Sequence, residues 1–180
     1  MSSPAETLAK AQRGLALLSI FLRKSDCDIA ESFTPPFHSA TAQIAAQVGN
    51  SVPRIRVTDV PNQDASLAGQ RFVEYFIDVK ATFSLPPTGE AFDEKSIIAH
   101  VGATFCVIYE LKTELSAEEL SAFGTINGIY HLWPYWREHL NNMCTRMMLP
   151  PLVLPMMNPS PSTKNASAAP PAEKPALAEK

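Results

Sequence analysis

The sequence has little charge, few cysteines and no apolar run long enough to cross a membrane. Only 18% of its 180 residues are charged, and the formal net charge is −3. Nucleic-acid binding is disfavoured, because proteins that bind phosphate backbones usually carry a basic face. The apolar run Gly14–Leu22 is far shorter than the roughly 20 residues that span a bilayer, and Arg23 and Lys24 follow it where a signal peptide would have its cleavage site. We therefore expect a cytoplasmic chain without membrane insertion.

The sequence also lacks the residue sets that hold metals or perform catalysis. Cys27, Cys106 and Cys144 are odd in number and far apart, which disfavours a disulfide framework or a Cys-x-x-Cys zinc site. His131 and His139 have no third ligand nearby in the sequence. There is no recognisable set of nucleophile, base and orienting residue and no glycine-rich phosphate loop. We expect free thiols, no metal, no cofactor and no enzymatic activity.

Composition divides the chain into three parts. Residues 159–180 consist almost entirely of Pro, Ala, Ser, Lys and Glu. Such a segment cannot bury enough apolar surface to offset the entropy of ordering, so we expect a disordered tail. We expect residues 1–10 to form a flexible or weakly helical N-terminus. Residues 11–158 then form a single folded domain.

The first half of this domain has the alternating pattern of β-strands. We expect strands at residues 15–30, 54–60, 70–85 and 96–111, with a long loop at 33–50 that includes a short helix or strand near residues 44–48. In the two long strands, alternate positions are apolar and predict the buried face of an antiparallel sheet: Val73, Tyr75, Ile77, Val79, Ala81 and Phe83 in one, and Ile97, Ala99, Val101, Ala103, Phe105, Val107, Tyr109 and Leu111 in the other.

The second half has the signals of helices. Ser116 and Glu119 form a capping-box pattern that predicts a helix start, and Asn127-Gly128 is typical of a helix end. Pro134 suits the first position of a second helix. The expected fold is α+β: a four-stranded antiparallel sheet with two C-terminal helices packed on one face.

The segment Leu132–Glu138, which reads Leu-Trp-Pro-Tyr-Trp-Arg-Glu, is followed by Leu149-Pro150-Pro151-Leu152. This arrangement resembles the signature helix and following loop of the SecB family of export chaperones. The Leu-Trp-Pro-Tyr form, together with Glu118-Glu119-Leu120, is most similar to the SecB-like chaperones associated with toxin–antitoxin systems. The resemblance is clearest over residues 71–154. It implies a homotetramer, built as a dimer of dimers, that holds unfolded polypeptide clients without ATP in a translocation-competent state.

The C-terminal part departs from the export chaperones, which usually continue into an Asn-Phe-Asp motif and end in an acidic tail that docks on the SecA translocation motor. Here residues 153–158 read Val-Leu-Pro-Met-Met-Asn, and the tail carries lysines as well as glutamates. SecA is therefore an open question as a partner. Two alternatives stand beside a general holdase: a dedicated chaperone of one antitoxin, and a small-molecule-binding α+β protein without chaperone activity.

Aromatic and methionine side chains are the candidate client-binding residues, because they adapt to many apolar partners. They are Phe33, Phe37, Trp133, Trp136, Met143, Met147 and Met148. The helical spacing of Trp136, Met143 and Met147 favours a core or a subunit interface over direct client contact. The resemblance also implies a partner site at the acidic residues Asp26, Asp28 and Glu31, for which a solvated strand end is the alternative.

Overall fold

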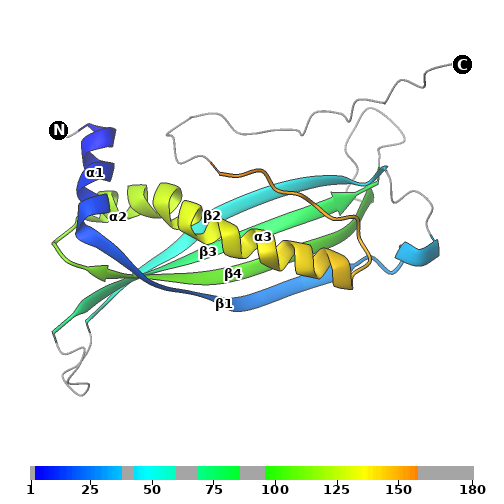
Figure 1. The fold of residues 1–180 in the computed structure, drawn as a ribbon, viewed down its shortest axis with the longest axis horizontal. Helices are drawn as coiled ribbons and strands as arrows, with labels where there is room; N and C mark the ends of the chain where they lie inside the picture. The colour runs from blue at the N-terminus through cyan, green and yellow to red at the C-terminus, as the bar shows by residue number, and fades with distance from the viewer. Residues whose placement is uncertain (1–2, 38–42, 60–68, 86–95, 158–180) are drawn as a thin grey trace, which may run out of the picture.

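The computed structural model describes residues 3–37, 43–59, 69–85 and 96–157. The elements of the described chain, in order, are α1 (Pro4–Gly14), β1 (Leu15–Ile29), β2 (Ala45–Asp59), β3 (Arg71–Ser84), β4 (Ile97–Leu111), α2 (Ala117–Phe123) and α3 (Ile129–Arg146). The four strands form one antiparallel sheet in the order β1-β4-β3-β2. Figure 1 shows α3 lying along one face of this sheet. The α+β fold expected from the sequence is confirmed.

The face of the sheet beneath the helices, called the inner face below, carries the alternating apolar residues of the two central strands. Tyr75 and Ile77 of β3 and Val101 and Val107 of β4 are all 0% exposed. The Tyr75 hydroxyl donates a hydrogen bond to the Leu120 carbonyl oxygen at 3.0 Å, which ties α2 to the sheet. Burial raises the pKa of this hydroxyl well above its ordinary value, so it stays protonated as a donor.

The helical half is more continuous than expected. Asn127-Gly128 does not end a helix, because a π-helical turn at Gly124–Gly128 joins α2 directly to α3. A Cβ atom on Gly124 would lie 2.5 Å from a Tyr75 ring carbon, and one on Gly128 would lie 3.3 Å from Ile77 Cδ1. Both glycines therefore let the helical backbone approach the sheet closely. Pro134 lies inside α3 and does not begin a helix, so that prediction is also wrong.

The second strand is longer than the sequence indicates. β2 spans Ala45–Asp59 and pairs with β3 over its whole length, which corrects both the short strand at 54–60 and the loop assigned up to residue 50. The register shifts between Ser51 and Arg54, around Pro53. Proline is tolerated there because β2 is an edge strand and the shift removes the need for a ladder hydrogen bond. Pairing with β3 thus outweighs the weak local propensity of this segment.

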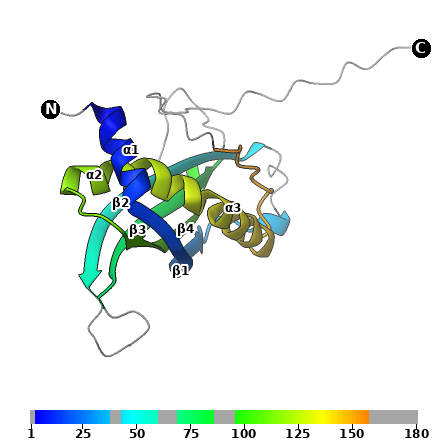
Figure 2. The ribbon, with the colours of Figure 1, turned by 60° about the vertical axis from the view of Figure 1, so that its left-hand side comes forward.

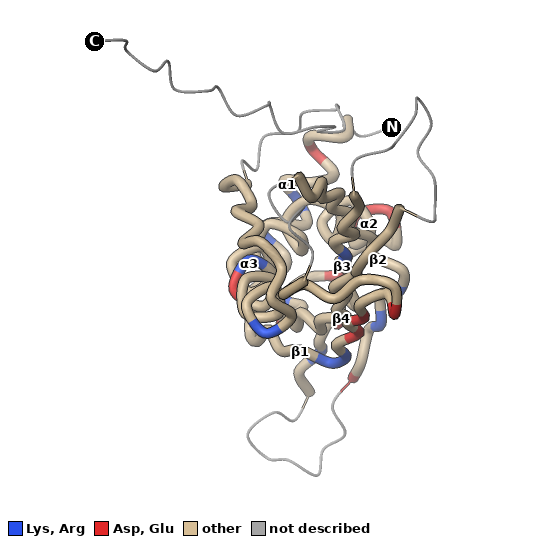
Figure 3. The backbone as a smooth tube through the Cα atoms, turned by 90° about the vertical axis from the view of Figure 1, so that its right-hand side faces the viewer, with Lys and Arg blue, Asp and Glu red and all other residues tan. Residues whose placement is uncertain are grey.

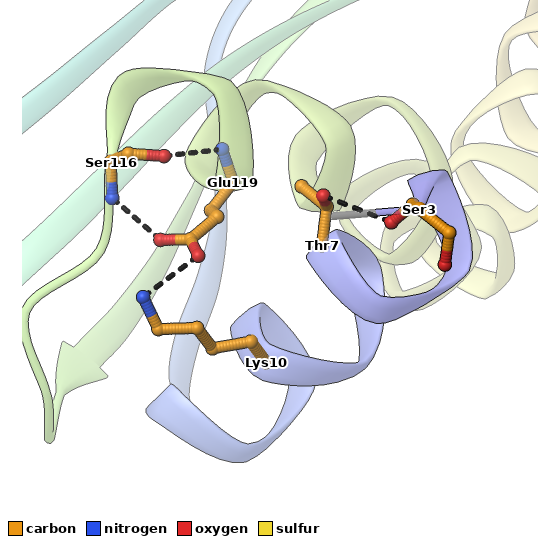
Figure 4. Close-up of polar contacts among 5 residues, drawn as sticks. All are labelled: Ser3, Thr7, Lys10, Ser116 and Glu119. Atoms are coloured by element: carbon orange, nitrogen blue, oxygen red, sulfur yellow. Dashed lines mark hydrogen bonds and ion pairs between the residues drawn. The ribbon is translucent and has the colours of Figure 1, made fainter. Parts of the chain in front are cut away.

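The N-terminus forms helix α1 where a flexible or weakly helical segment was expected. Ser3 and Glu6 make a capping box, a signal that the sequence analysis missed. Figure 4 shows α1 beside α2, with Lys10 Nζ at 2.8 Å from Glu119 Oε1. Burial of Ala11 against the core adds a tertiary contact that composition alone does not reveal. The whole of the expected tail, residues 159–180, and Asn158 lie outside the described residues.

Candidate functional site

The chain turns back on itself after α3 and runs along that helix (Figures 1 and 2). We call residues 147–157 the C-terminal strap. Met148 adopts a left-handed backbone conformation with φ of 56°, which makes the reversal. The Leu149 N–H then donates to the Cys144 carbonyl oxygen at 2.9 Å. Further on, Trp133 Nε1 donates to the Pro155 carbonyl oxygen at 2.8 Å, so one indole fixes the strap against α3.

The strap is apolar on both of its sides. Leu149 and Leu154 are buried against the core. Val153 and Met156, by contrast, are each 80% exposed, although both are apolar. Leu152 and Met157 are half-buried and pack against the core cluster. An extended apolar segment with this much exposed surface is typical of an interaction site.

The candidate client-binding residues fall into three groups. Trp136 and Phe33 are 0% and 4% exposed and belong to the core. Half-buried side chains form the second group: Trp133, Met143 and Met147. Phe37 and Met148 are 85% and 61% exposed. The second and third groups are therefore partly or largely exposed to solvent, whereas Trp136 and Phe33 are covered by the chain above them.

Trp136 lies in the hydrophobic core between α3 and the sheet. Its ring stacks on His139, whose centroid is 6.1 Å away, and His139 Nε2 lies 3.2 Å from Ser25 Oγ. Burial lowers the pKa of His139, which favours the neutral ring. The Trp136 Nε1 atom is buried and has no hydrogen-bond partner among the described residues. These contacts indicate a packing role for Trp136 and His139.

His131 is the second histidine that joins α3 to the sheet. Its Nδ1 atom lies 2.8 Å from the Tyr109 hydroxyl, and burial lowers its pKa. Within the described residues there is no group of three or more His, Cys, Asp or Glu side chains that could hold a metal ion. In the same part of the chain, no helix is both long and apolar enough to cross a bilayer.

The edge strand β1 exposes a row of apolar residues that sequence analysis did not single out. Leu17, Leu18, Phe21 and Leu22 are 40–59% exposed. In the described chain β1 pairs only with β4, which leaves its other edge open. The signal was present in the unbroken apolar run Leu15–Leu18, which offers apolar side chains to both faces. An open strand edge presents unpaired backbone N–H and C=O groups with which another chain can pair.

The acidic residues lie where β1 ends. Asp26 pairs opposite Gly102 and Asp28 opposite His100, on the face of the sheet away from the helices. Asp26 Oδ2 is 3.8 Å from His100 Nε2. Glu31 lies beyond the end of the strand, and all three carboxylates are exposed. The structure thus leaves them accessible to solvent.

Two known proteins are similar in sequence to part of this chain. No family model matches the sequence. Two curated relatives from two strains of Mycobacterium tuberculosis, the SecB-like chaperones Rv1957 and MT2006, are each 29% identical over 75 residues, which cover 39% of this chain. The match spans 41% of the length of each of these relatives.

A solved structure matches over much more of the chain. It is the Mycobacterium tuberculosis Rv1957 SecB-like chaperone in complex with a ChAD peptide from the Rv1956 HigA1 antitoxin. The TM-score is 0.59 at 18% sequence identity, over 85% of this chain and 97% of that one. The fold of this chain is therefore that of a SecB-like chaperone, and the resemblance to this family that its sequence predicts is confirmed.

Proposed function

We propose that this protein is a non-enzymatic holdase chaperone that keeps unfolded polypeptide clients from aggregating, without ATP. The observation that carries the proposal is the exposed apolar surface on the strap and at the end of α3, on a SecB-like fold. A holdase needs apolar surface that the protein does not cover itself. Met148, Val153 and Met156 provide such surface, and flexible methionines can adapt to clients of different sequence.

The accessible members of the candidate set are the proposed client contacts. Phe37 and Met148 would meet the client first, and Trp133, Met143 and Met147 would follow as the client settles against α3. Trp136 and Phe33 lie beneath them and support this layer. A client strand could in addition pair with an open sheet edge, where main-chain hydrogen bonds are independent of client sequence.

We propose a homotetramer, a dimer of dimers, as the working form in the cytoplasm. The exposed apolar row Leu17, Leu18, Phe21 and Leu22 on the open edge of β1 supports a contact between subunits. Burying this row would remove apolar area from water that a lone subunit exposes. Light scattering at micromolar protein measures the assembly directly, and a monomer there would contradict the tetramer.

The test is suppression of aggregation of a chemically unfolded, slowly refolding protein without ATP. We expect the full chain to suppress aggregation near one client per tetramer. The double variant Phe37→Ser, Met148→Ser should weaken suppression by about tenfold, because it removes the two most accessible apolar contacts of the set. Val57→Ser removes exposed apolar surface from β2 and serves as the matched control. Equal loss in both variants would contradict the assignment of the site.

A dedicated antitoxin chaperone is the second candidate. It is favoured because the neighbouring solved structure of Rv1957 is bound to an antitoxin peptide. A dedicated chaperone would bind the antitoxin encoded beside its own gene and leave unrelated unfolded proteins to aggregate. SecA remains a proposed partner that a binding measurement with purified motor would test. Failure with every client, including a neighbouring antitoxin, would favour the small-molecule-binding alternative.

A further inference from the structure

The face of the sheet away from the helices, called the outer face below, carries a cluster of cations around one aromatic ring. The guanidinium carbon of Arg54 lies 3.7 Å from the centroid of the Phe76 ring. Those of Arg23 and Arg56 lie 5.4 Å and 5.6 Å from the same centroid. Phe76 is only 3% exposed, because these arginines from β1 and β2 cover it. We call Arg23, Lys24, Arg54, Arg56 and Phe76 the basic cluster.

Only one cation of the cluster has a carboxylate partner in the described part of the chain. Arg56 pairs with Glu74, with Nη2 at 2.7 Å from Oε1, and this pair lowers the pKa of Glu74. Within the described residues, Arg23, Lys24 and Arg54 have no carboxylate at ion-pair distance. These three positive charges are therefore available to a partner.

The unpaired cations surround a hollow. It has a volume of about 370 Å³, and Arg23, Lys24, Pro53 and Arg54 line it over Phe76. Asp78 and Thr104 also line the hollow, and one Asp78 carboxylate oxygen accepts a hydrogen bond from the Thr104 hydroxyl at 2.6 Å. A guanidinium stacked flat on a ring keeps its N–H groups directed sideways to solvent, in the geometry that binds a carboxylate in bidentate fashion. The hollow can thus take an acidic side chain together with a small apolar group.

We propose that the basic cluster docks a short acidic segment of a partner protein on the outer face of the sheet. Charge complementarity carries the proposal: three unpaired cations gather in a chain whose formal net charge is −3. Two carboxylates would meet Arg23 and Arg54, and a third would meet Lys24.

The surroundings favour a short acidic segment over a long polyanion. Asp26 and Asp28 follow the cluster on β1 and face the same side of the sheet, opposite Gly102 and His100. Figure 3 shows the acidic and basic positions close together around β1 and β4. An RNA strand or an anionic membrane would carry negative charge across these carboxylates and be repelled. A segment with two or three carboxylates fits within the basic cluster.

This site is independent of the proposed holdase function. The strap and α3 cover the inner face, whereas the basic cluster lies on the outer face. Client holding and acidic docking should therefore be separable by mutation. Loss of one activity would leave the other measurable.

The experiment measures fluorescence anisotropy of a labelled 12-residue peptide that carries three Asp or Glu residues and one Leu, added to the full-length protein. We expect saturable binding at about 20 mM salt that weakens at about 300 mM, where exposed charges are screened. A peptide with Asn and Gln in place of the acids should bind about tenfold more weakly. The double variant Arg23→Gln, Arg54→Gln should lose about tenfold affinity for the acidic peptide and keep its suppression of aggregation.

The matched control is Arg13→Gln, Arg146→Gln, which removes the same charge from exposed positions of α1 and α3. It should bind the acidic peptide as the unaltered protein does. Phe76→Leu keeps every charge and removes the ring, and we expect a loss of about threefold because the ring no longer holds the Arg54 guanidinium over it. Equal loss in the control and the cluster variant would overturn the proposal. Tighter binding of a labelled oligouridine, or of vesicles with anionic lipid, would overturn it in favour of a polyanion.

Discussion

The two faces of the sheet bury aromatic rings by different means. On the inner face, Tyr75, Tyr109 and Phe123 pack against one another, with Tyr75 and Tyr109 edge to face at 5.5 Å between centroids. On the outer face, Phe76 is nearly as well buried, but arginine side chains cover it. Burial alone therefore does not distinguish a core from a binding surface. A partner can move the arginine side chains that cover a ring on the outer face, whereas it cannot move the packed rings of the inner face.

The two faces should also differ in how much stability is lost when a buried side chain is removed. Removing a side chain from the inner face leaves a cavity between a helix and a sheet that cannot collapse freely. Removing one from the outer face leaves arginines that can turn to water at little cost. The inner face should thus be sensitive to volume and the outer face to charge.

The largest expected effect is that of Trp136→Ala. Trp136 is 0% exposed between α3 and the sheet, so its removal should lower the free energy of unfolding by about 3–5 kcal/mol. Phe76→Ala on the outer face should cost about 2 kcal/mol or less, because its cover can rearrange. Urea unfolding at one fixed protein concentration measures both, since assembly would otherwise shift the result. Equal losses would break the distinction between the faces.

The next effect concerns the close approach of the π-helical turn to the inner face. Gly124→Ala places a methyl group 2.5 Å from a Tyr75 ring carbon, and we expect a loss of about 1–3 kcal/mol from overpacking. Gly49 on β2 is the matched control, because a Cβ there meets nothing within 4 Å. Gly49→Ala should be neutral or slightly stabilising. Unchanged stability in Gly124→Ala would show that the helix can move away from the sheet without cost.

Much of the inner face could be predicted from the sequence. The alternation in β3 and β4 identified residues such as Val73 and Tyr109, since a half-buried strand reverses its side chains at every position. The π-helical junction could not be predicted in the same way. Glycine is a common helix end by local preference, whereas here the helix continues through Gly128, which lies so close to the sheet that a Cβ would be 3.3 Å from Ile77 Cδ1. Tertiary packing likewise lengthened β2 beyond its local signals.

The outer face was harder to predict from the sequence than the inner face. Phe76 is an apolar residue on a face that also carries Glu74 and Asp78, and the side chains that cover it come from β1 and β2, which are distant in sequence. Low overall charge argued against a basic face, whereas the sheet gathers Arg23 and Arg54 at one place. The same limit applied to Trp136, whose apolar helical spacing favours a core or a subunit interface without excluding a client surface. Only the burial of each side chain separates those roles.

The smallest expected effects are dependences on pH that differ between the faces. Burial lowers the pKa of His139 on the inner side below its ordinary 6.5. The unfolded chain then binds the proton more readily, so this contribution to stability is complete above pH 6.5 and is lost as pH falls through the lowered pKa. On the outer face, the hydrogen bond from Arg56 lowers the pKa of Glu74 below its ordinary 4.5. That contribution is complete above pH 4.5 and is lost as pH falls further.

Two variants separate these windows. His139→Gln can keep a hydrogen bond to Ser25 and should flatten the fall in unfolding free energy just below pH 6.5, by about 1 kcal/mol. Some slope should remain there, because burial lowers the pKa of His131 too. Glu74→Gln should flatten only the fall below pH 4.5, and by less than about 1 kcal/mol, since Arg56 is half exposed and water screens the pair. Urea unfolding measured from pH 3 to pH 8, in steps of about half a unit, resolves the two windows. If both variants changed the same window, the two faces would not titrate independently.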